Sequence, residues 1–313
     1  MNDSNLKVSI IMLAYNHGKF IEQAIQSILE QDVDFNYELL IGEDCSADNT
    51  REIAERYQAM YPKVIKVIKH DKNIGARRNE NILLRKCVGQ YIAMLEGDDY
   101  WIYCNKLQRQ VEFLDTHPEY IGVAHNVKAV GVRGEKLPRR LAGFPWEKEH
   151  IYTKQNALNF EIIGHVSGWM HRNIWKMLPK KELKMIERCK VNGDQKMSVI
   201  LGLKGDVYFF EDVWSVYRRR FDSNTWSARF RYKNMFLFYY EKTVEMKNLL
   251  KDCYGINIDI DKKLLEYLYN ALQLWKQKPT FENTTILVTM LRKRDLKKRR
   301  VLQCFWKMRQ ERT

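Results

Sequence analysis

The stretch that decides the fold runs from Gln90 to Trp101 and reads Gln-Tyr-Ile-Ala-Met-Leu-Glu-Gly-Asp-Asp-Tyr-Trp. Its apolar first half is typical of a buried strand. A strand that ends in Asp98 and Asp99 presents two carboxylates at the carboxyl edge of a sheet, where open α/β sheets bind ligands. Adjacent like charges repel unless a cation or several hydrogen-bond donors hold them. The pair therefore predicts a Mg²⁺ or Mn²⁺ site, with a solvated acidic turn as the alternative.

Strand-like and helix-like patterns alternate along the first hundred residues. Apolar strand patterns and amphipathic helical patterns follow one another at residues 8–13, 18–31, 37–42, 46–61, 64–69, 76–88 and 90–95. Alternation of this kind predicts right-handed crossovers and an α/β fold with a Rossmann-like, mostly parallel central sheet flanked by helices.

The pattern changes further along the chain. We expect a helix, a strand, a loop, a second helix and two short strands at residues 106–117, 120–127, 128–150, 194–203, 207–210 and 213–217. After about residue 225 the periodicity predicts a helical C-terminal extension, with long helices at 232–253, 262–276 and 280–308.

Composition limits the class of protein. The 313 residues are 45% hydrophobic and 29% charged, which is typical of a globular chain. Apolar runs such as 8–13 are too short to cross a bilayer, and residues 1–20 lack a signal-peptide pattern. The six cysteines form no Cys-x-x-Cys pair, so zinc and thiol-redox motifs are absent. These features predict a cytoplasmic protein with reduced thiols.

Positive charge is concentrated at the C-terminal end. The formal net charge is +14, and residues 291–313 hold ten Lys or Arg against two acidic residues. A basic amphipathic tail with aromatic residues is typical of helices that lie on anionic membranes. Packing of an ordinary helix is the alternative. Nucleic acid is disfavoured as a partner because no recognised binding motif accompanies the charge.

Polar motifs follow each of the four early strands. They are Ala14-Tyr15-Asn16, Glu43-Asp44 with Ser46 and Asp48-Asn49-Thr50, Asn73-Ile74-Gly75, and Gly97-Asp98-Asp99. Because the carboxyl ends of parallel strands share one edge of the sheet, these motifs are expected to converge in one cleft.

The chain resembles the family-2 glycosyltransferases of the GT-A fold over roughly residues 7–225. The resemblance lies in these four motifs, in residues 165–169 (His-Val-Ser-Gly-Trp) and in Gly193-Asp194. The resemblance implies a nucleotide-sugar-binding half at 1–115 and an acceptor-binding half at 116–225. Residues 226–313 would form a separate helical region with the basic tail.

The resemblance also implies roles for single residues on the donor side. Asp44 would accept a hydrogen bond from the uracil N–H, Asp98 would bind the ribose hydroxyls, and Asp99 would hold Mn²⁺ or Mg²⁺. The nucleotide would also contact Ala14, Tyr15, Asn16, Asn73 and Gly75. A helix cap is the alternative for Asp44, and plain packing is the alternative for Ala14 and Tyr15.

The acceptor side is expected to supply a general base, because an alcohol attacks poorly until its proton is removed. The resemblance implies that Asp194 is this base and that the anomeric centre is inverted. A helix cap is the alternative role for Asp194, and Glu187 is a weaker alternative as the base. His165 and Trp169 are acceptor-side candidates, although Trp169 could equally belong to the core.

One departure from the family concerns the metal. Arg220 stands where many relatives carry a histidine ligand, and an arginine offers no lone pair to a metal. With Arg219 it could instead clamp a diphosphate.

Two functions follow. The first is an inverting glycosyltransferase that moves a sugar from a UDP-sugar to a hydroxyl of a glycan or lipid-linked acceptor in surface polysaccharide synthesis, in the cytoplasm or at the inner face of the membrane. The alternative is a non-catalytic nucleotide-sugar or glycan-binding module with a degenerate metal site. A nucleotidyltransferase is disfavoured because the loop after the first strand is short. A dehydrogenase is disfavoured because that strand is not followed by Gly-x-Gly-x-x-Gly.

Overall fold

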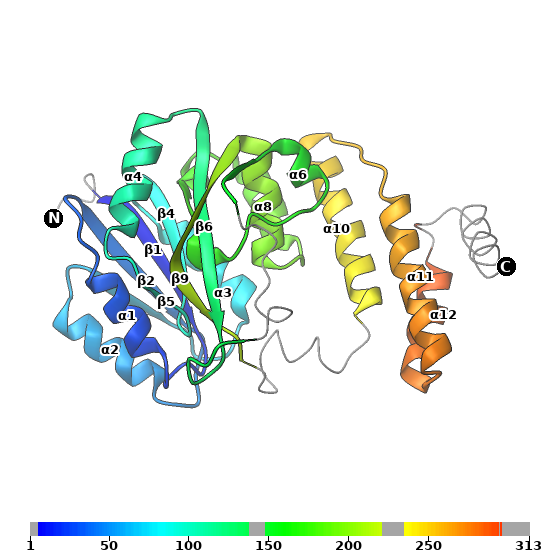
Figure 1. The fold of residues 1–313 in the computed structure, drawn as a ribbon, viewed down its shortest axis with the longest axis horizontal. Helices are drawn as coiled ribbons and strands as arrows, with labels where there is room; N and C mark the ends of the chain where they lie inside the picture. The colour runs from blue at the N-terminus through cyan, green and yellow to red at the C-terminus, as the bar shows by residue number, and fades with distance from the viewer. Residues whose placement is uncertain (1–5, 138–147, 221–234, 294, 296–313) are drawn as a thin grey trace. The chain divides into compact units, whose positions relative to one another are not determined.

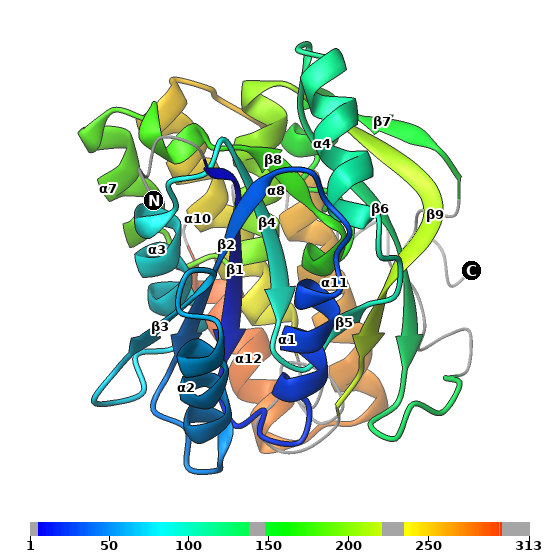
Figure 2. The same cartoon turned by 90° about the vertical axis from the view of Figure 1, so that its left-hand side faces the viewer.

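The protein is described by a computed structural model, which places residues 6–137, 148–220, 235–293 and 295. In this part of the chain one sheet has the strand order β3-β2-β1-β4-β8-β6-β9-β5, and β7 pairs with β9 (Figures 1 and 2). The strands are β1 (Leu6–Ala14), β2 (Asn36–Glu43), β3 (Ile65–Lys69), β4 (Tyr91–Glu96), β5 (Tyr100–Trp101), β6 (Tyr120–Val130), β7 (His150–Tyr152), β8 (Met170–Arg172) and β9 (Asp206–Arg218).

Helices cover both faces of the first four strands. They are α1 (Ile21–Leu29), α2 (Thr50–Met60), α3 (Ala76–Lys86) and α4 (Lys106–Thr116). One apolar core joins α1, α2 and α4 to alternate residues of β1, β2 and β4, whereas α3 contacts β1 and β2 from the opposite face (Figure 2). The mostly parallel α/β sheet expected from the sequence is confirmed.

The sequence explains why α1 forms and which side it buries. Ile21, Ala24, Ile25 and Ile28 recur at helical spacing and are all fully buried. They meet every second residue of the parallel strand β1, where the side-chain period is two. One face of α1 therefore fixes one face of the sheet.

Strand β8 joins the parallel part of the sheet to the second part. It runs antiparallel to both β4 and β6, and β6 in turn runs parallel to β9. The two short strands expected at 207–210 and 213–217 are a single strand, β9. Its register shifts near the exposed Glu211 and Asp212, so a bulge absorbs the polar pair that breaks the apolar pattern.

The second half also holds shorter elements that the sequence did not predict. They are α6 (Lys154–Leu158), η2 (Val166–Gly168), η3 (Ile174–Lys176) and α7 (Lys180–Arg188); α8 (Gly193–Lys204) was expected. The predicted loop at 128–150 is shorter at both ends, because β6 continues to Val130 beside β9 and β7 begins at His150.

Three helices follow in the C-terminal region, as expected: α10 (Phe236–Tyr254), α11 (Asp261–Gln277) and α12 (Phe281–Arg292). They pack on one another, and α10 ends at Gly255, whose positive φ of 66° suits a glycine. The predicted helix at 280–308 reaches Arg292, and most of its remainder lies outside the described residues. No helix among the described residues has the length and apolar character needed to cross a membrane.

The described chain falls into two compact units. The first holds the residues up to Leu183 and those from Asn192 to Arg219. The second holds residues 184–191 and the chain from Arg220 onward. All of the sheet, and every candidate site residue except Arg220, belongs to the first unit.

Candidate functional site

The loops after β1 and β2 are tied together by hydrogen bonds. The backbone N–H of Asn16 donates to Ser46 Oγ at 3.0 Å, and the backbone N–H of Ala47 donates to the Asn16 side-chain Oδ1 at 2.9 Å. Asn16 and Cys45 both adopt a positive φ, at 54° and 59°. Non-glycine residues held in this region cluster at functional sites. The first two predicted motifs are therefore in contact, in a strained arrangement.

The loop after β3 is fixed by Asp44. Its two carboxylate oxygens accept hydrogen bonds from the backbone N–H groups of Ile74 (2.7 Å) and Gly75 (2.9 Å), and the residue is 2% exposed. Gly75 has a φ of 85°, which an L-residue rarely adopts. Asp44 therefore holds the Asn73–Gly75 loop, and its predicted contact with uracil stays a prediction.

Two donor-side candidates differ in exposure. Tyr15 follows β1 and is 38% exposed, so its ring is available to a ligand, whereas Ala14 is buried in the sheet. Asp98 lies after β4, with Oδ2 3.5 Å from Nε2 of His17. These contacts bring the first and fourth motifs together, as the convergence of strand ends predicted.

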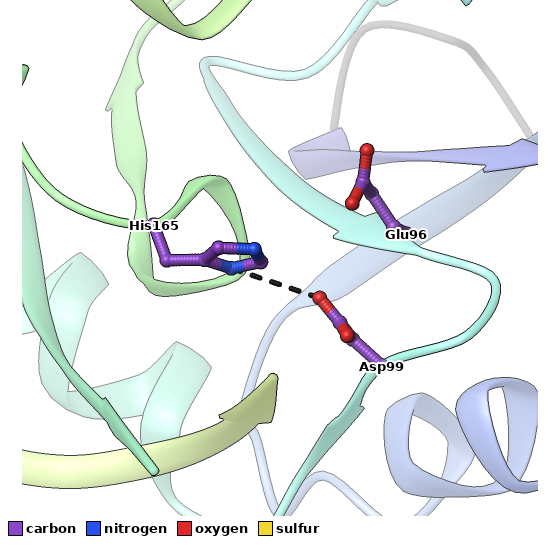
Figure 3. A group of neighbouring side chains, drawn as sticks. All are labelled: Glu96, Asp99 and His165. Carbon is purple, nitrogen blue, oxygen red and sulfur yellow. Dashed lines mark ion pairs between the residues drawn. The ribbon is translucent and has the colours of Figure 1, made fainter. Parts of the chain in front are cut away.

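Asp99 forms a cluster with Glu96 and His165 (Figure 3). One ligand atom from each side chain lies within 4.8 Å of the other two, and Asp99 Oδ2 is 3.6 Å from His165 Nδ1. Glu96 ends β4, Asp99 follows it, and His165 precedes η2. The sequence predicts only an acceptor-side role for His165, because 66 residues separate it from Asp99 and no local spacing signals their contact.

The electrostatics of this cluster suit a cation. Burial raises the pKa of Asp99 well above its usual range, and the nearby carboxylates of Asp98 and Glu96 raise it further. Within the described residues, the buried Asp99 Oδ2 has no hydrogen-bond partner. A divalent ion would supply the positive charge that this atom lacks, because unpaired buried carboxylates are costly.

His165 can act as a neutral ligand. Burial lowers the pKa of its imidazole to about 3, so that the ring is uncharged at neutral pH. Its Nδ1 accepts a hydrogen bond from the Ser167 backbone N–H at 3.3 Å and lies 2.7 Å from Ser167 Oγ. The same nitrogen lies 3.6 Å from Asp99 Oδ2, so Nδ1 is the ring nitrogen that faces the cluster. Carboxylates suit Mg²⁺ and Mn²⁺, and an imidazole moves the preference toward a transition ion such as Mn²⁺.

Arg218 is a residue that the sequence analysis missed. Its backbone N–H donates to Asp99 Oδ1 at 2.8 Å, and its guanidinium donates to the Asp98 carbonyl oxygen. It therefore fixes the acidic turn from the end of β9. Arg219 donates its backbone N–H to Val130. Arg220 is buried and belongs to the second unit, so the predicted diphosphate clamp stays a prediction.

Trp169 is 1% exposed and belongs to the core, which fits the packing alternative rather than stacking on a sugar. The turn before it is held by buried side chains. Trp101 Nε1 donates to the Ser167 carbonyl at 2.9 Å, and Gln110 Nε2 donates to the Gly168 carbonyl at 2.9 Å. These bonds fix the turn that carries His165.

Asp194 lies in the first turn of α8 and is partly buried. Burial raises the pKa of its carboxyl group, the direction that strengthens a base. Its Oδ1 accepts a hydrogen bond from the Gln195 N–H at 2.7 Å. A cap and a base are both compatible with this position.

The start of α8 lies against α3. A methyl group on Gly193 would be 2.4 Å from Oε2 of Glu80, so this carboxylate rests on the backbone beside Asp194. Glu80 follows the first residue of α3 by four positions, about 6 Å along a helix. The start of α8, which carries Asp194, therefore lies beside α3, the helix that follows the loop held by Asp44.

Known proteins share both the sequence and the fold. The sequence profile of Glycosyl transferase family 2 matches residues 9–173. An uncharacterised protein of Mycobacterium tuberculosis is 36% identical over 153 residues, which are 49% of this chain and 44% of that protein. The poly(ribitol-phosphate) β-N-acetylglucosaminyltransferase TarS of Staphylococcus aureus is 28% identical over 138 residues, 44% of this chain and 23% of its own. The match thus spans less than half of either relative.

Solved structures agree on the fold. Residues 1–349 of S. aureus TarS in complex with UDP-GlcNAc superpose with a TM-score of 0.60 at 18% identity, covering 91% of this chain and 80% of that one. The mannosyltransferase PcManGT of Pyrobaculum calidifontis, in complex with GDP-Man and Mn²⁺, gives 0.52 at 15% identity, covering 91% and 79%.

The fold and the site define a GT-A glycosyltransferase architecture. The chain belongs to glycosyltransferase family 2.

Proposed function

We propose that the protein is an inverting glycosyltransferase that takes its sugar from a UDP-sugar. The observation that carries the proposal is the cluster of the half-buried Glu96 with the buried Asp99 and His165 at the carboxyl edge of the sheet. The exposed Tyr15 and the carboxylate of Asp98 lie at the same edge. Such a site combines a flat aromatic surface, an acceptor for hydroxyl groups and a place for a divalent ion.

On the donor side, Tyr15 would lie against the base and Asp98 would accept hydrogen bonds from the ribose. Asp99, with Glu96 and His165, would hold Mn²⁺ or Mg²⁺, which when bound supplies positive charge to the departing diphosphate. Arg218 keeps the Asp98–Asp99 turn in place. The choice of uridine rests on family resemblance and on the UDP-GlcNAc complex of TarS.

On the acceptor side, Asp194 would take the proton of the attacking hydroxyl. A carboxyl group whose pKa is raised by burial holds a proton more strongly, and a base nearer in pKa to the working pH transfers it more efficiently. Attack from the face opposite the nucleotide would invert the anomeric centre. We propose a hydroxyl of a glycan or lipid-linked acceptor in surface polysaccharide synthesis, because TarS is named for transfer to poly(ribitol phosphate).

We propose that the protein acts in the cytoplasm, at the inner face of the membrane. The support is the basic tail at 291–313, most of which lies outside the described residues. Deletion of 294–313 should weaken binding to anionic vesicles in a sedimentation assay, and unchanged binding would exclude this docking.

The proposed activity is tested by screening UDP-, GDP- and dTDP-sugars for donor hydrolysis with Mn²⁺ or Mg²⁺. We expect a UDP-sugar to be hydrolysed slowly, and Asp99→Asn to lose that hydrolysis. Glu112→Gln, which removes an exposed carboxylate on α4, is the matched control and should retain it. Tight UDP binding without turnover of any donor would favour the alternative, a non-catalytic binding module.

That alternative was motivated by Arg220 in place of a histidine ligand. His165, 3.6 Å from Asp99, offers an imidazole from a different part of the chain. This observation supports the hypothesis of a catalytic glycosyltransferase over that of a non-catalytic binding module.

A further inference from the structure

A fully buried lysine is joined to the turn that carries His165, and it has no part in the function proposed above. Lys106 is the first residue of α4 and is 0% exposed. Lysine is almost never buried completely unless a partner holds its amino group. Its Nζ donates to Gln110 Oε1 at 2.7 Å and lies 4.0 Å from the centroid of the Trp101 ring. Lys106 therefore contacts two side chains, and both of them reach the same turn.

The turn, η2, is held through two of its carbonyl groups. Gln110 Nε2 donates to the Gly168 carbonyl at 2.9 Å, and Trp101 Nε1 donates to the Ser167 carbonyl at 2.9 Å. Ser215 Oγ donates to the same Ser167 carbonyl at 3.1 Å. All three donor side chains are buried, so these bonds face little competition from water.

The same turn is in direct contact with the ring of His165. The Ser167 backbone N–H donates to His165 Nδ1 at 3.3 Å, and this nitrogen lies 3.6 Å from Asp99 Oδ2. The turn has little room to shift, since a methyl group on Gly168 would lie 2.6 Å from the His125 carbonyl oxygen. The place of the imidazole at the proposed metal site therefore depends on the backbone of η2.

Lys106 decides which end of the Gln110 amide faces the turn. A glutamine amide carries an acceptor and a donor side by side, whereas an ammonium group has donors and no acceptor. Lys106 therefore pairs with Oε1 and leaves Nε2 for the Gly168 carbonyl. Burial lowers the pKa of Lys106 well below its usual range, but N–H groups that can make this bond are present in both charge states. The face of the Trp101 ring attracts a cation, so Lys106 holds this second donor as well.

We propose that Lys106 is a positioning residue that acts through His165. It orients Gln110 and Trp101 so that both donate to η2, and this turn then holds the imidazole toward the proposed metal site. The role of Lys106 rests on the function proposed above, in which His165 is a metal ligand. Residues that orient a metal ligand commonly affect metal affinity although they never touch the ion.

Binding of Mn²⁺ to the full-length protein tests this role without a donor sugar. Lys106→Met keeps an unbranched side chain and removes its amino group, so the affinity for Mn²⁺ in calorimetry should fall about tenfold. The affinity for Mg²⁺ should fall less, because Mg²⁺ depends on oxygen ligands. Arg109→Met removes a cation from an exposed position of the same helix and should bind Mn²⁺ as wild type does.

A double variant separates positioning from a general effect on the fold. Because Lys106 is proposed to act through His165, adding Lys106→Met to His165→Gln should cause no further loss of Mn²⁺ affinity. Losses that multiply in the double variant, or wild-type affinity in Lys106→Met, would overturn the proposal. If Lys106→Met fails to fold by circular dichroism, Lys106→Leu replaces it with the same expectations.

The metal-free protein provides a second readout. With ¹⁵N-labelled histidine in EDTA, His165→Gln identifies the NMR signals of the His165 ring. These signals should move in Lys106→Met and stay in place in Arg109→Met, because only the first variant removes a support of the turn. Unchanged signals in Lys106→Met would contradict the positioning role.

The outcomes also distinguish this role from the function proposed above. If His165→Gln binds Mn²⁺ as tightly as wild type, the metal site is wrong and the role of Lys106 falls with it. If His165→Gln binds Mn²⁺ more weakly but Lys106→Met binds it normally, only the role of Lys106 is wrong. If both variants bind Mn²⁺ weakly and no donor is turned over, the positioning role is supported and the proposed transfer is wrong.

Discussion

Two pairs of adjacent acidic residues stand at the ends of strands of this sheet, and they differ in how many hydrogen-bond donors compensate their buried carboxylates. In the pair after β2, Glu43 accepts from the Ser46 N–H at 2.7 Å and from Arg51 Nε at 2.5 Å, and Asp44 accepts from two backbone N–H groups. In the pair after β4, Asp99 has one backbone donor and an oxygen left without a hydrogen bond in the described structure.

The difference shows how one sequence pattern gives two kinds of site. Carboxylates whose oxygens all accept hydrogen bonds from protein donors hold a loop in place, because their charge is already compensated. A buried carboxylate with an oxygen left over needs a partner from outside the chain. The adjacent acids in the sequence are alike, and only the donors around them separate a structural pair from a cation site.

The largest expected effect is that of Asp99→Asn on activity. Removing the carboxylate should lower donor hydrolysis at least about 10³-fold, because the charge that holds the metal is lost. Hydrolysis of a UDP-sugar with Mn²⁺ measures it. Full activity in this variant would indicate that Asp98 and Asp99 form an acidic turn and not a metal site.

The same substitution should have the opposite effect on stability. The pKa of folded Asp99 is raised above its unfolded value of about 4, so metal-free wild-type protein binds the extra proton when folded. Its stability should therefore fall as pH rises through the folded pKa. Asp99→Asn should lack this slope and gain about 1–2 kcal/mol at pH 7.5, as measured by thermal unfolding in EDTA. Equal slopes in both proteins would contradict the assigned burial.

Asp44→Asn should chiefly lower stability. The amide would turn a donor toward one of the two backbone N–H groups, at a cost of about 2–4 kcal/mol in urea unfolding. Asp212→Asn, at an exposed site on β9, serves as the matched control and should change little. If Asp44→Asn keeps wild-type stability yet loses UDP binding, the contact with uracil predicted from family resemblance would gain support instead.

His165→Gln tests the third member of the proposed metal site of Glu96, Asp99 and His165. Loss of the imidazole should weaken Mn²⁺ binding at least about tenfold in calorimetry, and Mg²⁺ binding less, because Mg²⁺ depends on oxygen ligands. His117→Gln, at the residue that caps the C-terminal end of α4, is the control. Equal affinity for Mn²⁺ in His165→Gln and wild type would remove His165 from the metal site.

The smallest effect is expected at Tyr15, outside both acidic pairs. Tyr15→Ala should weaken UDP binding about tenfold through loss of stacking, with stability changed by no more than about 0.5 kcal/mol. Tyr61→Ala removes a ring of similar exposure just after α2 and should leave UDP binding unchanged. Titration of UDP into each variant provides the measurement.

The sequence predicted the first half of the fold well because its signals are local. Helix α1 buries Ile21, Ala24 and Ile25 on one stripe, and that spacing can be read without knowing the partner. Strand β8 could not be read in this way. It has three residues, too few to show a period, and it forms only because β4 and β6 leave a place between them.

The candidate site was likewise predictable only where its signals are local in the sequence. Motifs that follow strands were placed correctly at one edge, because topology alone brings parallel strand ends together. The partnership of Asp99 with His165 and Arg218 was missed, since it depends on strand pairings over long separations. The contact of Glu80 with Gly193 carried no signal either, because it joins residues far apart in the sequence.

The bond from Arg218 to Asp99 spans 119 residues of chain. It has a consequence for the order of events during synthesis. A nascent chain that has released β4 already carries both acidic pairs, but the donor that fixes Asp99 is still to be translated. The pair after β2 can close on its neighbours early, whereas the centre at Asp99 must wait until β9 has emerged from the ribosome and paired with β6. Long-range pairing of this kind is slow to form. The proposed cation site is therefore expected to be among the last parts of the first unit to mature.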